Sequence, residues 1–249
     1  MRGQGVEAVV FDWGGTLAPF AQVDMTEMWR LAARRLAPER EEEVCARLVA
    51  VEEASWSRIA VDQRSTTLSS LLALASAELG LDVAEAVLEE AATHHLDSWT
   101  PHLHHDPEAV PTLAALRERG LRIGLLSNTH WPRAFHEHFL ARDGLAGLID
   151  VRCYTSELPH TKPHPEAFAT VLGQLGVADP ARAVFVGDRP YDDVFGAKSM
   201  GMRAVLRPNP SVPGYATEPD AAIDRLAELV GVVDRWLGAG FDRAVPGHA

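Results

Sequence analysis

The chain has 249 residues, of which 47% are hydrophobic and 23% are charged. This composition predicts a soluble globular protein with one large domain, or one domain with an insertion, and it excludes extensive disorder. The formal net charge is −12, and a broad negative field repels nucleic acid and anionic membranes. We therefore expect neither of them as a partner.

The sequence also bears on where the protein resides. It has no run of about 18 apolar residues, which a membrane helix needs, and its first residues lack the pattern of a signal peptide. Cys45 and Cys153 are its two cysteines, so a disulfide framework is not expected. These features predict a cytoplasmic protein, either a monomer or a homodimer.

The first predicted strand is Val6–Asp12, an apolar run that ends at an acid just before Gly14 and Gly15. From Thr26 to Leu96 apolar residues recur at helical spacing among Glu and Arg, without a strand pattern. We predict an all-helical insertion of three to five helices here, within residues 20–100.

After the insertion, strand and helix patterns alternate. They predict helix Pro107–Arg119, strand Leu121–Asn128, helix Trp131–Ala141, strand Ile149–Thr155, helix Pro165–Leu175, strand Ala183–Asp188, helix Asp192–Met200, strand Arg203–Leu206 and helix Ala221–Leu237. Such alternation is typical of an α/β fold with a parallel sheet and helices on both faces. The predicted division is a core of residues 1–19 and 101–240, a helical cap of residues 20–100, and a flexible tail at 241–249.

Polar residues stand where three of the predicted strands end. They are Asp12, the pair Ser127-Asn128, and Asp188, while Lys162 lies in a loop before a helix. Each has an ordinary structural role available to it, such as capping the helix that follows. Because ligands bind at the carboxyl ends of parallel strands, their shared position predicts one functional site.

Four motifs carry a resemblance to a known family. They are FDWGGTL (Phe11–Leu17), LLSN (Leu125–Asn128), Lys162-Pro163 and VGDRPYDD (Val186–Asp193). In this order they resemble the motifs of the haloacid dehalogenase superfamily, which consists mostly of phosphate-ester hydrolases. The resemblance implies a Rossmann-like core with an all-helical cap of the subfamily I type inserted after the first strand. The insertion predicted above lies where that cap belongs.

The resemblance assigns a role to each matching residue. Asp12 would be the nucleophile, because a carboxylate can attack phosphorus and form an aspartyl-phosphate. Mg²⁺ would be held by Asp12, Asp188 and the carbonyl of Gly14, since this ion prefers oxygen ligands. Ser127 and Lys162 would bind the phosphoryl group and neutralise its developing charge. The implied activity is hydrolysis of a small phosphorylated metabolite.

Further residues would support these groups. Asn128 and Trp13 are expected to contact the substrate, and Trp13 either walls the pocket or packs against the cap. Asp193 and Thr16 are expected behind the metal ligands, with Asp193 holding Lys162 or a water molecule on the metal. The cap would close over the site and set specificity by excluding water.

The sequence departs from the family's phosphatases at one position. They carry a second aspartate two residues after the nucleophile, which protonates the leaving group, and this chain has Gly14 there. C–P or C–halogen chemistry would account for the difference, and the first motif resembles that of the family's C–P hydrolase. That enzyme uses a cap lysine, however, and no lysine precedes Lys162. The C–halogen hydrolases work without metal and would not need Gly187-Asp188.

Glycine at this position is also compatible with two alternatives. In the first, another residue supplies the proton, and His130, His160 and His164 are the candidates. A good leaving group, as in an acyl or aryl phosphate, would also reduce the need for a proton donor. Alternatively, the chain is a catalytically impaired relative that binds a phosphorylated ligand or a protein partner. The favoured interpretation is a Mg²⁺-dependent phosphatase.

Apart from His130, His160 and His164, the histidine, tryptophan and arginine side chains that stand out beyond the four motifs are expected to be structural. A histidine-rich segment is expected to be an exposed hinge rather than a zinc site, because no nearby cysteine completes a ligand set; its members are His94, His95, His102, His104 and His105. Trp29 and Trp56 are expected in the core of the cap. Arg58 and Arg64 are expected on a solvated helix face, with reach over the site as the alternative.

Overall fold

The computed structural model describes residues 5–238, so the tail predicted at 241–249 lies outside the described residues. Within residues 5–238, six parallel strands form one sheet in the order β3-β2-β1-β4-β5-β6. The strands are β1 (Ala8–Phe11), β2 (Arg122–Ser127), β3 (Val151–Tyr154), β4 (Ala183–Gly187), β5 (Arg203–Leu206) and β6 (Ala221–Ala222). The predicted α/β class is confirmed. No helix in this part of the chain has the length and apolarity to cross a membrane.

The order of the strands places β1 at the centre of the sheet. Phe11, its last residue, lies beside Leu125 of β2 on one side and Val186 of β4 on the other. The chain therefore proceeds outward in both directions from β1, and the residues that follow β1, β2 and β4 meet at one edge. Ligands bind at such a reversal of strand order.

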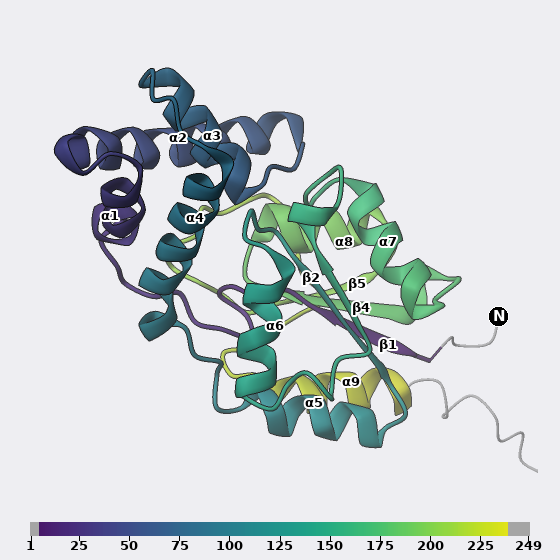
Figure 1. Ribbon diagram of the computed structural model, residues 1–249. Helices are drawn as coiled ribbons and strands as arrows, with labels where there is room; N and C mark the ends of the chain where they lie inside the picture. Colours follow the sequence, from purple (N-terminus) through teal and green to yellow (C-terminus); the bar gives the residue numbers. More distant parts are fainter. Residues whose placement is uncertain (1–4, 239–249) are drawn as a thin grey trace, which may run out of the picture.

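Helices cover both faces of the sheet (Figure 1). The helices of the core are α5 (Ala109–Glu118), α6 (Arg133–Arg142), α7 (Pro165–Leu175), α8 (Gly196–Ser199) and α9 (Glu228–Gly238). Val9 and Phe11 pack into the apolar cluster that includes residues of α5, α6 and α9, whereas Ala8 and Val10 pack into the cluster of α7 and α8. Burial on both faces explains why β1 is a continuous apolar run.

The predicted helix Ala221–Leu237 is wrong in its first part. Ala221 and Ala222 form β6 beside β5, and the amide of Ile223 donates to the carbonyl oxygen of Leu206 at 2.9 Å. The helix begins only at Glu228. Alanine favours helices, but the open edge of β5 supplies backbone partners, and tertiary context overrides a propensity of less than about 1 kcal/mol per residue.

The segment after β4 also differs from its prediction. A π-helix at Pro190–Phe195 precedes the short α8, where one helix over Asp192–Met200 was expected. The carboxylate oxygen Oδ2 of Asp193 accepts a hydrogen bond from the amide of Arg189 at 2.9 Å. π-Turns are frequent at functional sites. The other core elements begin and end within one or two residues of their predicted bounds.

The insertion is helical, as predicted. Its helices are α1 (Met25–Leu36), α2 (Glu41–Asp62), α3 (Leu68–Glu78) and α4 (Glu85–Trp99). They enclose an apolar cluster of their own, which includes the fully buried Trp29 together with Leu48, Leu72 and Ala91. Figure 1 shows this layer beside the end of the sheet at which β1 finishes. The limits of the cap at residues 20 and 100 stay a prediction.

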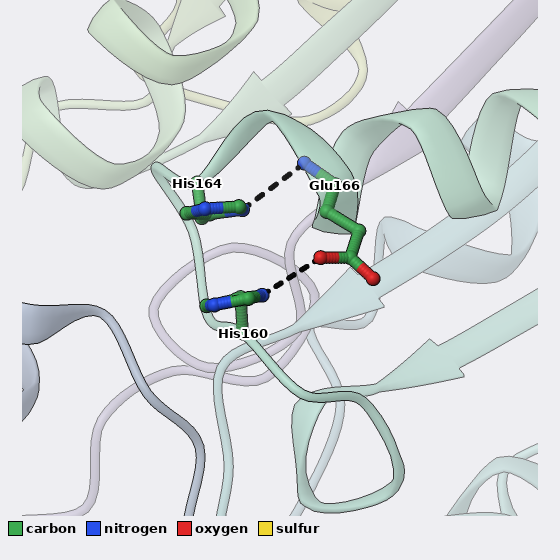
Figure 2. A group of neighbouring side chains, drawn as sticks. All are labelled: His160, His164 and Glu166. Atoms are coloured by element: carbon green, nitrogen blue, oxygen red, sulfur yellow. Dashed lines mark hydrogen bonds and ion pairs between the residues drawn. The ribbon is translucent and has the colours of Figure 1, made fainter.

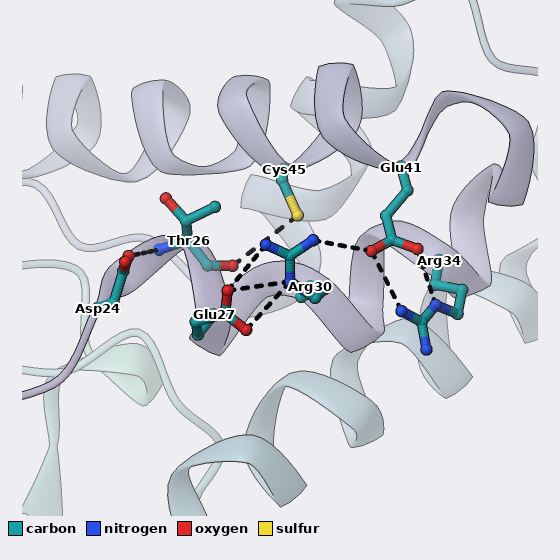
Figure 3. A network of polar contacts seen from close by, with 7 residues as sticks. All are labelled: Asp24, Thr26, Glu27, Arg30, Arg34, Glu41 and Cys45. Atoms are coloured by element: carbon teal, nitrogen blue, oxygen red, sulfur yellow. Dashed lines mark hydrogen bonds and ion pairs between the residues drawn. The ribbon is translucent and has the colours of Figure 1, made fainter.

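A polar network joins α1 to α2 (Figure 3). Asp24 caps α1 by accepting a hydrogen bond from the amide of Thr26 at 2.8 Å. Glu41, the first residue of α2, accepts from Arg34 at 2.8 Å and from Arg30 at 3.0 Å, and these bonds lower the pKa of Glu41 to about 2. Surface ion pairs contribute little stability, so the apolar cluster holds the layer together.

The expectation of exposed histidines is wrong for His95 and His105. His95 is fully buried, and the side chain of His105 is 4% exposed. The ring of His95 stacks on Trp29 with 3.6 Å between centroids. Its Nδ1 lies 3.2 Å from the carbonyl oxygen of Met28, and its Nε2 accepts from the indole of Trp99 at 3.3 Å. His95 is therefore part of the core of the insertion.

This burial predicts a pH-dependent contribution to stability. Desolvation lowers the pKa of His95 from 6.5 to about 3, assisted by the nearby His130 and opposed by the hydrogen bond to Met28. Between these pH values His95 is protonated in the unfolded chain but not in the folded protein. The contribution of buried His95 to the free energy of unfolding is therefore complete above pH 6.5 and is lost as the pH falls. His95→Phe should therefore be less stable than wild type at pH 7, and the gap should shrink by about 2 kcal/mol at pH 5. Urea unfolding at both pH values measures the gap, and an equal gap would contradict the assignment.

Candidate active site

Three acidic side chains meet at the carboxyl edge of the sheet. Asp12 directly follows β1, Asp188 directly follows β4, and Asp193 lies in the π-helix. One oxygen from each lies within 4.8 Å of the others, and all three residues are buried. Three residues that are far apart in the sequence therefore form one compact carboxylate cluster, as the strand-end rule predicts for Asp12 and Asp188.

Lys162 lies inside this cluster. Its Nζ donates to Oδ1 of Asp12 at 2.6 Å and to Oδ1 of Asp193 at 2.7 Å, and the residue is 2% exposed. Asn128 holds the loop of Lys162, because Oδ1 of Asn128 accepts from the Lys162 amide at 2.8 Å and its Nδ2 donates to the Lys162 carbonyl at 3.0 Å. The side-chain amide of Asn128 thus positions Lys162, whereas Asn128 was expected to contact the substrate.

The cluster carries an unbalanced charge. Three carboxylates surround one ammonium group, which leaves two negative charges if all groups are ionised. Burial raises the pKa of Asp12 to about 7, with Lys162 opposing and the neighbouring carboxylates adding to the rise. Burial and Asp193 raise the pKa of Asp188 to about 6. For Lys162, burial lowers the pKa, but Asp12 and Asp193 outweigh it and hold the value above the ordinary one. A divalent cation would balance this charge.

The donor set fits Mg²⁺ on structural grounds. Oδ1 of Asp188 is buried and has no hydrogen-bond partner among the described residues, while Oδ2 accepts from Asn209 at 3.1 Å. Carboxylate oxygens and a backbone carbonyl are the ligands that this ion prefers. Gly15 permits the close approach of Asp188, since it has φ of +85° and a Cβ there would lie 2.3 Å from Oδ2 of Asp188. A residue with a side chain would displace the carboxylate.

Sequence reasoning missed Asn209. It lies three residues beyond the end of β5, at the same edge of the sheet as Asp188. The strand-end rule points to it when the rule is applied to β5 as well as to β1, β2 and β4. It orients one oxygen of Asp188 and leaves the other available.

The remaining predicted residues also lie at this edge. Ser127 is 3% exposed and lines a cavity above the cluster. Thr16 is fully buried, and its Oγ1 has no hydrogen-bond partner in the described part of the chain. The carbonyl oxygen of Thr16 accepts from Arg207 at 2.6 Å, and Arg207 also pairs with Asp106 at 2.6 Å. These contacts fix the turn that carries Asp12.

Trp13 lies in the cavity wall, which is one of the two roles that the sequence left open, and its packing against the cap stays a prediction. It lines the cavity and also packs in the core cluster beneath α5 and α6. Its indole Nε1 donates to Nε2 of His105 at 2.9 Å, and Nδ1 of His105 lies 2.7 Å from Oδ2 of Asp143. The carboxylate of Asp143 keeps the hydrogen on Nδ1, so Nε2 is free to accept from Trp13. His105 therefore orients the residue beside the proposed nucleophile.

The cavity lies between the insertion and the core and has a volume of about 480 Å³. Six predicted site residues line it, namely Asp12, Trp13, Gly14, Ser127, Asn128 and Lys162. His130 lines it too, is 5% exposed, and has its Nε2 3.3 Å from Oε1 of Glu52, outside hydrogen-bond geometry. Of the three histidines that were candidate proton donors, His130 is the one in the cavity wall.

His160 and His164 occupy a different place (Figure 2). Their rings stack with 3.7 Å between centroids. Nδ1 of His160 lies 2.8 Å from Oε2 of Glu166, and Nδ1 of His164 accepts from the Glu166 amide at 3.3 Å, which caps α7. Neither histidine lines the cavity. Both flank Lys162 in the sequence, but their polar contacts lie at the start of α7.

The structure also places the histidine-rich segment, the cap tryptophan and the two cap arginines. Within residues 5–238, the groups of three or more potential metal ligands are the carboxylate cluster and the group His160, His164 and Glu166, so the His94–His105 segment does not converge on a metal site. Trp56 is 37% exposed and lines the cavity, so its assignment to the cap core is wrong. Arg58 pairs with Asp62 at 3.6 Å, and neither Arg58 nor Arg64 lines the cavity.

A parallel Rossmann-like sheet, a helical insertion after β1 and buried carboxylates with a lysine at the strand ends define an α/β protein with a polar candidate active site. A family model for haloacid dehalogenase-like hydrolases matches residues 6–201. The chain belongs to this family, and it is an enzyme of the hydrolase type.

Curated relatives include phosphatases and a C–P hydrolase. The chain is 29% identical to the glyceraldehyde 3-phosphate phosphatase of Methanopyrus kandleri over 62% of this chain and 67% of that one. It is 30% identical to the phosphoglycolate phosphatase of Rhodospirillum rubrum over 93% of this chain and 91% of that one. It is 26% identical to the phosphonoacetaldehyde hydrolase of Bordetella pertussis over 74% of this chain and 66% of that one, slightly less than two thirds of its length.

Solved structures share the fold. A 2-haloacid dehalogenase from Pseudomonas syringae pv. Tomato DC3000 superposes with a TM-score of 0.65 at 26% identity, covering 93% of this chain and 99% of that one. The relatives thus span phosphate ester, C–P and C–halogen hydrolases. Which of these reactions the chain performs depends on its own site.

Proposed function

We propose that this protein is a Mg²⁺-dependent phosphatase that acts on a small phosphorylated metabolite through an aspartyl-phosphate on Asp12. The observation that carries the proposal is the buried cluster in which Lys162 bridges Asp12 and Asp193 beside Asp188. The phosphatases among the relatives support it. The C–halogen alternative is disfavoured because Asp188 would then be a buried carboxylate without a task.

The C–P alternative lacks its amine. A Schiff base needs a lysine that can reach the substrate from the cap, and the chain has two lysines, Lys162 and Lys198. Lys162 is bonded to two carboxylates, and Lys198 pairs with Asp220 outside the cavity. The first motif resembles that of the C–P hydrolases, but the chain lacks the cap lysine that forms the Schiff base in their mechanism.

The proposed metal ligands are Asp12, Asp188 and the Gly14 carbonyl. Bound there, Mg²⁺ would offset the negative charge that otherwise repels a phosphate dianion. Lys162 and Ser127 would hold the phosphoryl oxygens and stabilise the charge that develops on them. Asp193 fixes the ammonium group of Lys162 through a 2.7 Å hydrogen bond. Thr16 stays a proposed supporting residue.

The reaction would proceed in two displacements. A carboxylate oxygen of Asp12 attacks phosphorus, the bond from phosphorus to the leaving oxygen breaks, and that oxygen takes up a proton. Water then attacks the phosphorus of the aspartyl-phosphate, which returns the carboxylate and releases inorganic phosphate. Among the candidate histidines, His130 lines the cavity and its Nε2 makes no hydrogen bond, but burial lowers the pKa of His130 to about 4. The ring is therefore neutral at pH 7, and water is the proposed source of the proton.

Gly14→Asp tests the missing acid directly. A Cβ at Gly14 would meet its nearest neighbour, Cε1 of Phe20, at 3.7 Å, and Gly14 does not have a positive φ, so the backbone accepts a side chain. We expect turnover of alkyl phosphates to rise by about tenfold or more, since general acid catalysis is worth about 10²–10⁴-fold. Gly14→Asn is the matched control, because it has the same shape and cannot donate a carboxyl proton. Equal rates in the two variants would count against a vacant acid position.

The proposed function itself is tested by phosphate release from esters and acyl phosphates, with Mg²⁺ and with a chelator. Release that requires Mg²⁺ is the expected result. If no compound is hydrolysed although Mg²⁺ binds, the second candidate stands, which is a relative that binds a phosphorylated ligand or a protein partner. The absence of an acid at Gly14 is the observation that favours this candidate. A cytoplasmic location, the monomeric or homodimeric state and closure of the cap stay predictions.

A further inference from the structure

The wall of the cavity above the carboxylate cluster is strongly apolar. Beyond the site residues, its lining consists mainly of hydrophobic side chains from the insertion, the linker before α1 and the core: Ala18, Pro19, Phe20, Ala21, Met25, Val49, Trp56, Ile59, Ala60, Trp99, Leu103 and Trp131. Two of the large ones, Phe20 and Trp56, are 46% and 37% exposed. Exposing large apolar side chains to water is unfavourable in free energy, and an apolar ligand in the cavity would cover them.

The same wall offers little to a second negative charge. The cationic side chains that line the cavity are Lys162 and Arg189. Lys162 is bonded to Asp12 and Asp193, and Arg189 faces Asp192 at 3.7 Å. A leaving group with a carboxylate or another phosphate would also meet Glu52 and Glu53. Among the described lining residues, each of these cations already lies within 4 Å of a carboxylate.

We propose that the leaving group is a bulky, uncharged and largely apolar alcohol, of the size of an aromatic ring or a six-carbon chain. This inference rests on the proposed phosphatase function. It assigns the apolar wall to the leaving group and the polar edge, with Asp12, Ser127 and Lys162, to the phosphoryl group. Pockets with a mostly apolar lining and a few converging polar groups are typical of small-molecule sites.

A series of esters with alcohols of similar acidity tests the inference. Ethyl, butyl, hexyl and 2-phenylethyl phosphate are compared with glycerol phosphate and phosphoglycolate in the presence of Mg²⁺. We expect kcat/KM to rise by up to about fourfold per buried methylene, which corresponds to about 0.8 kcal/mol, and to be at least about tenfold higher for 2-phenylethyl phosphate than for glycerol phosphate. Equal or higher values for glycerol phosphate or phosphoglycolate would overturn the proposal.

Two valines of α2 provide a matched pair of variants. Val49 lines the cavity, whereas Val61 is 84% exposed and does not. Val49→Asn should lower kcat/KM for hexyl and 2-phenylethyl phosphate about tenfold more than it lowers kcat/KM for acetyl phosphate, whose short acyl group has little apolar surface to bury. Val61→Asn should change neither. Equal effects of Val49→Asn on hexyl phosphate and acetyl phosphate would contradict the assignment.

A binding measurement separates this inference from the proposed function. Trp13, Trp56, Trp99 and Trp131 line the cavity, so an aromatic ligand should change their fluorescence. The probe is 2-phenylethylphosphonate, which cannot be hydrolysed as an ester, with methylphosphonate as the control. If neither acetyl phosphate nor any of the esters is hydrolysed but 2-phenylethylphosphonate binds at least about tenfold more tightly than methylphosphonate, the phosphatase assignment fails and the apolar site stands. If acetyl phosphate is hydrolysed and the two phosphonates bind equally, the inference fails alone.

Discussion

Asp12→Asn should abolish Mg²⁺-dependent phosphate release, with a loss of about 10⁴-fold or more, because an amide cannot form the aspartyl-phosphate. The backbone and packing around the residue should persist, since the substitution changes one buried atom. Steady-state release from acetyl phosphate and 2-phenylethyl phosphate measures the loss. Asp97→Asn, a substitution of the same type on the exposed face of α4, is the control and should leave the rate unchanged.

The same variant should be at least as stable as the wild type without Mg²⁺. Asp12 has a pKa raised from 3.8 to about 7, so the folded protein binds the extra proton between these values. Ionised Asp12 therefore lowers the free energy of unfolding of the metal-free protein above about pH 7, and this penalty disappears as the pH falls. Asp12→Asn should raise the melting temperature at pH 8 and have a smaller effect at pH 5.5. Turnover that survives in Asp12→Asn would remove Asp12 from the nucleophile role.

Lys162→Met should have the opposite effect on stability. Removing the ammonium group leaves Asp12 and Asp193 buried without their partner, and breaking a buried pair in this way costs about 3–5 kcal/mol. Turnover should also fall by about 10²–10³-fold, because the charge on the transferring phosphoryl group loses its donor. Urea unfolding and phosphate release measure the two effects. Added Mg²⁺ should restore part of the lost stability, since it supplies the missing positive charge.

The chain offers a matched control for this experiment. Lys198, its other lysine, pairs with Asp220 at 2.9 Å, and both side chains are about one third exposed. Lys198→Met should cost less than about 1 kcal/mol and leave turnover unchanged, as expected for a surface ion pair. If Lys162→Met proves too unstable to purify, Lys162→Arg keeps the charge and should lose less stability than Lys162→Met, while turnover still falls. A Lys162→Met protein as stable as Lys198→Met would show that the cluster does not depend on the lysine.

Sequence patterns alone placed much of this protein correctly. The apolar run before Asp12 and the alternation of strand and helix patterns after residue 101 predicted the parallel sheet. The spacing of apolar residues and the length of each apolar segment indicate which residues are buried. Polar residues at strand ends predicted that Asp12, Ser127 and Asp188 lie at one edge, because parallel strands of one sheet end together. The helical insertion followed from apolar spacing that no strand can satisfy.

Other features were decided by the tertiary structure. Ala221 and Ala222 form a strand because the edge of β5 lies beside them, although their local preference is helical. His95 is a core residue because Trp29 and Trp99 surround it, and its neighbours in the sequence do not reveal that burial.

The character of the cavity likewise depends on the folded chain. Trp56 and Phe20 face a space that exists only when the insertion lies over the sheet. Local patterns determine which segments are helices and strands and where their polar ends lie, because those properties depend on neighbouring residues. Which side chains meet across the insertion and the core depends on contacts between distant residues, and these contacts determine the pKa values of the site and the chemistry of its wall.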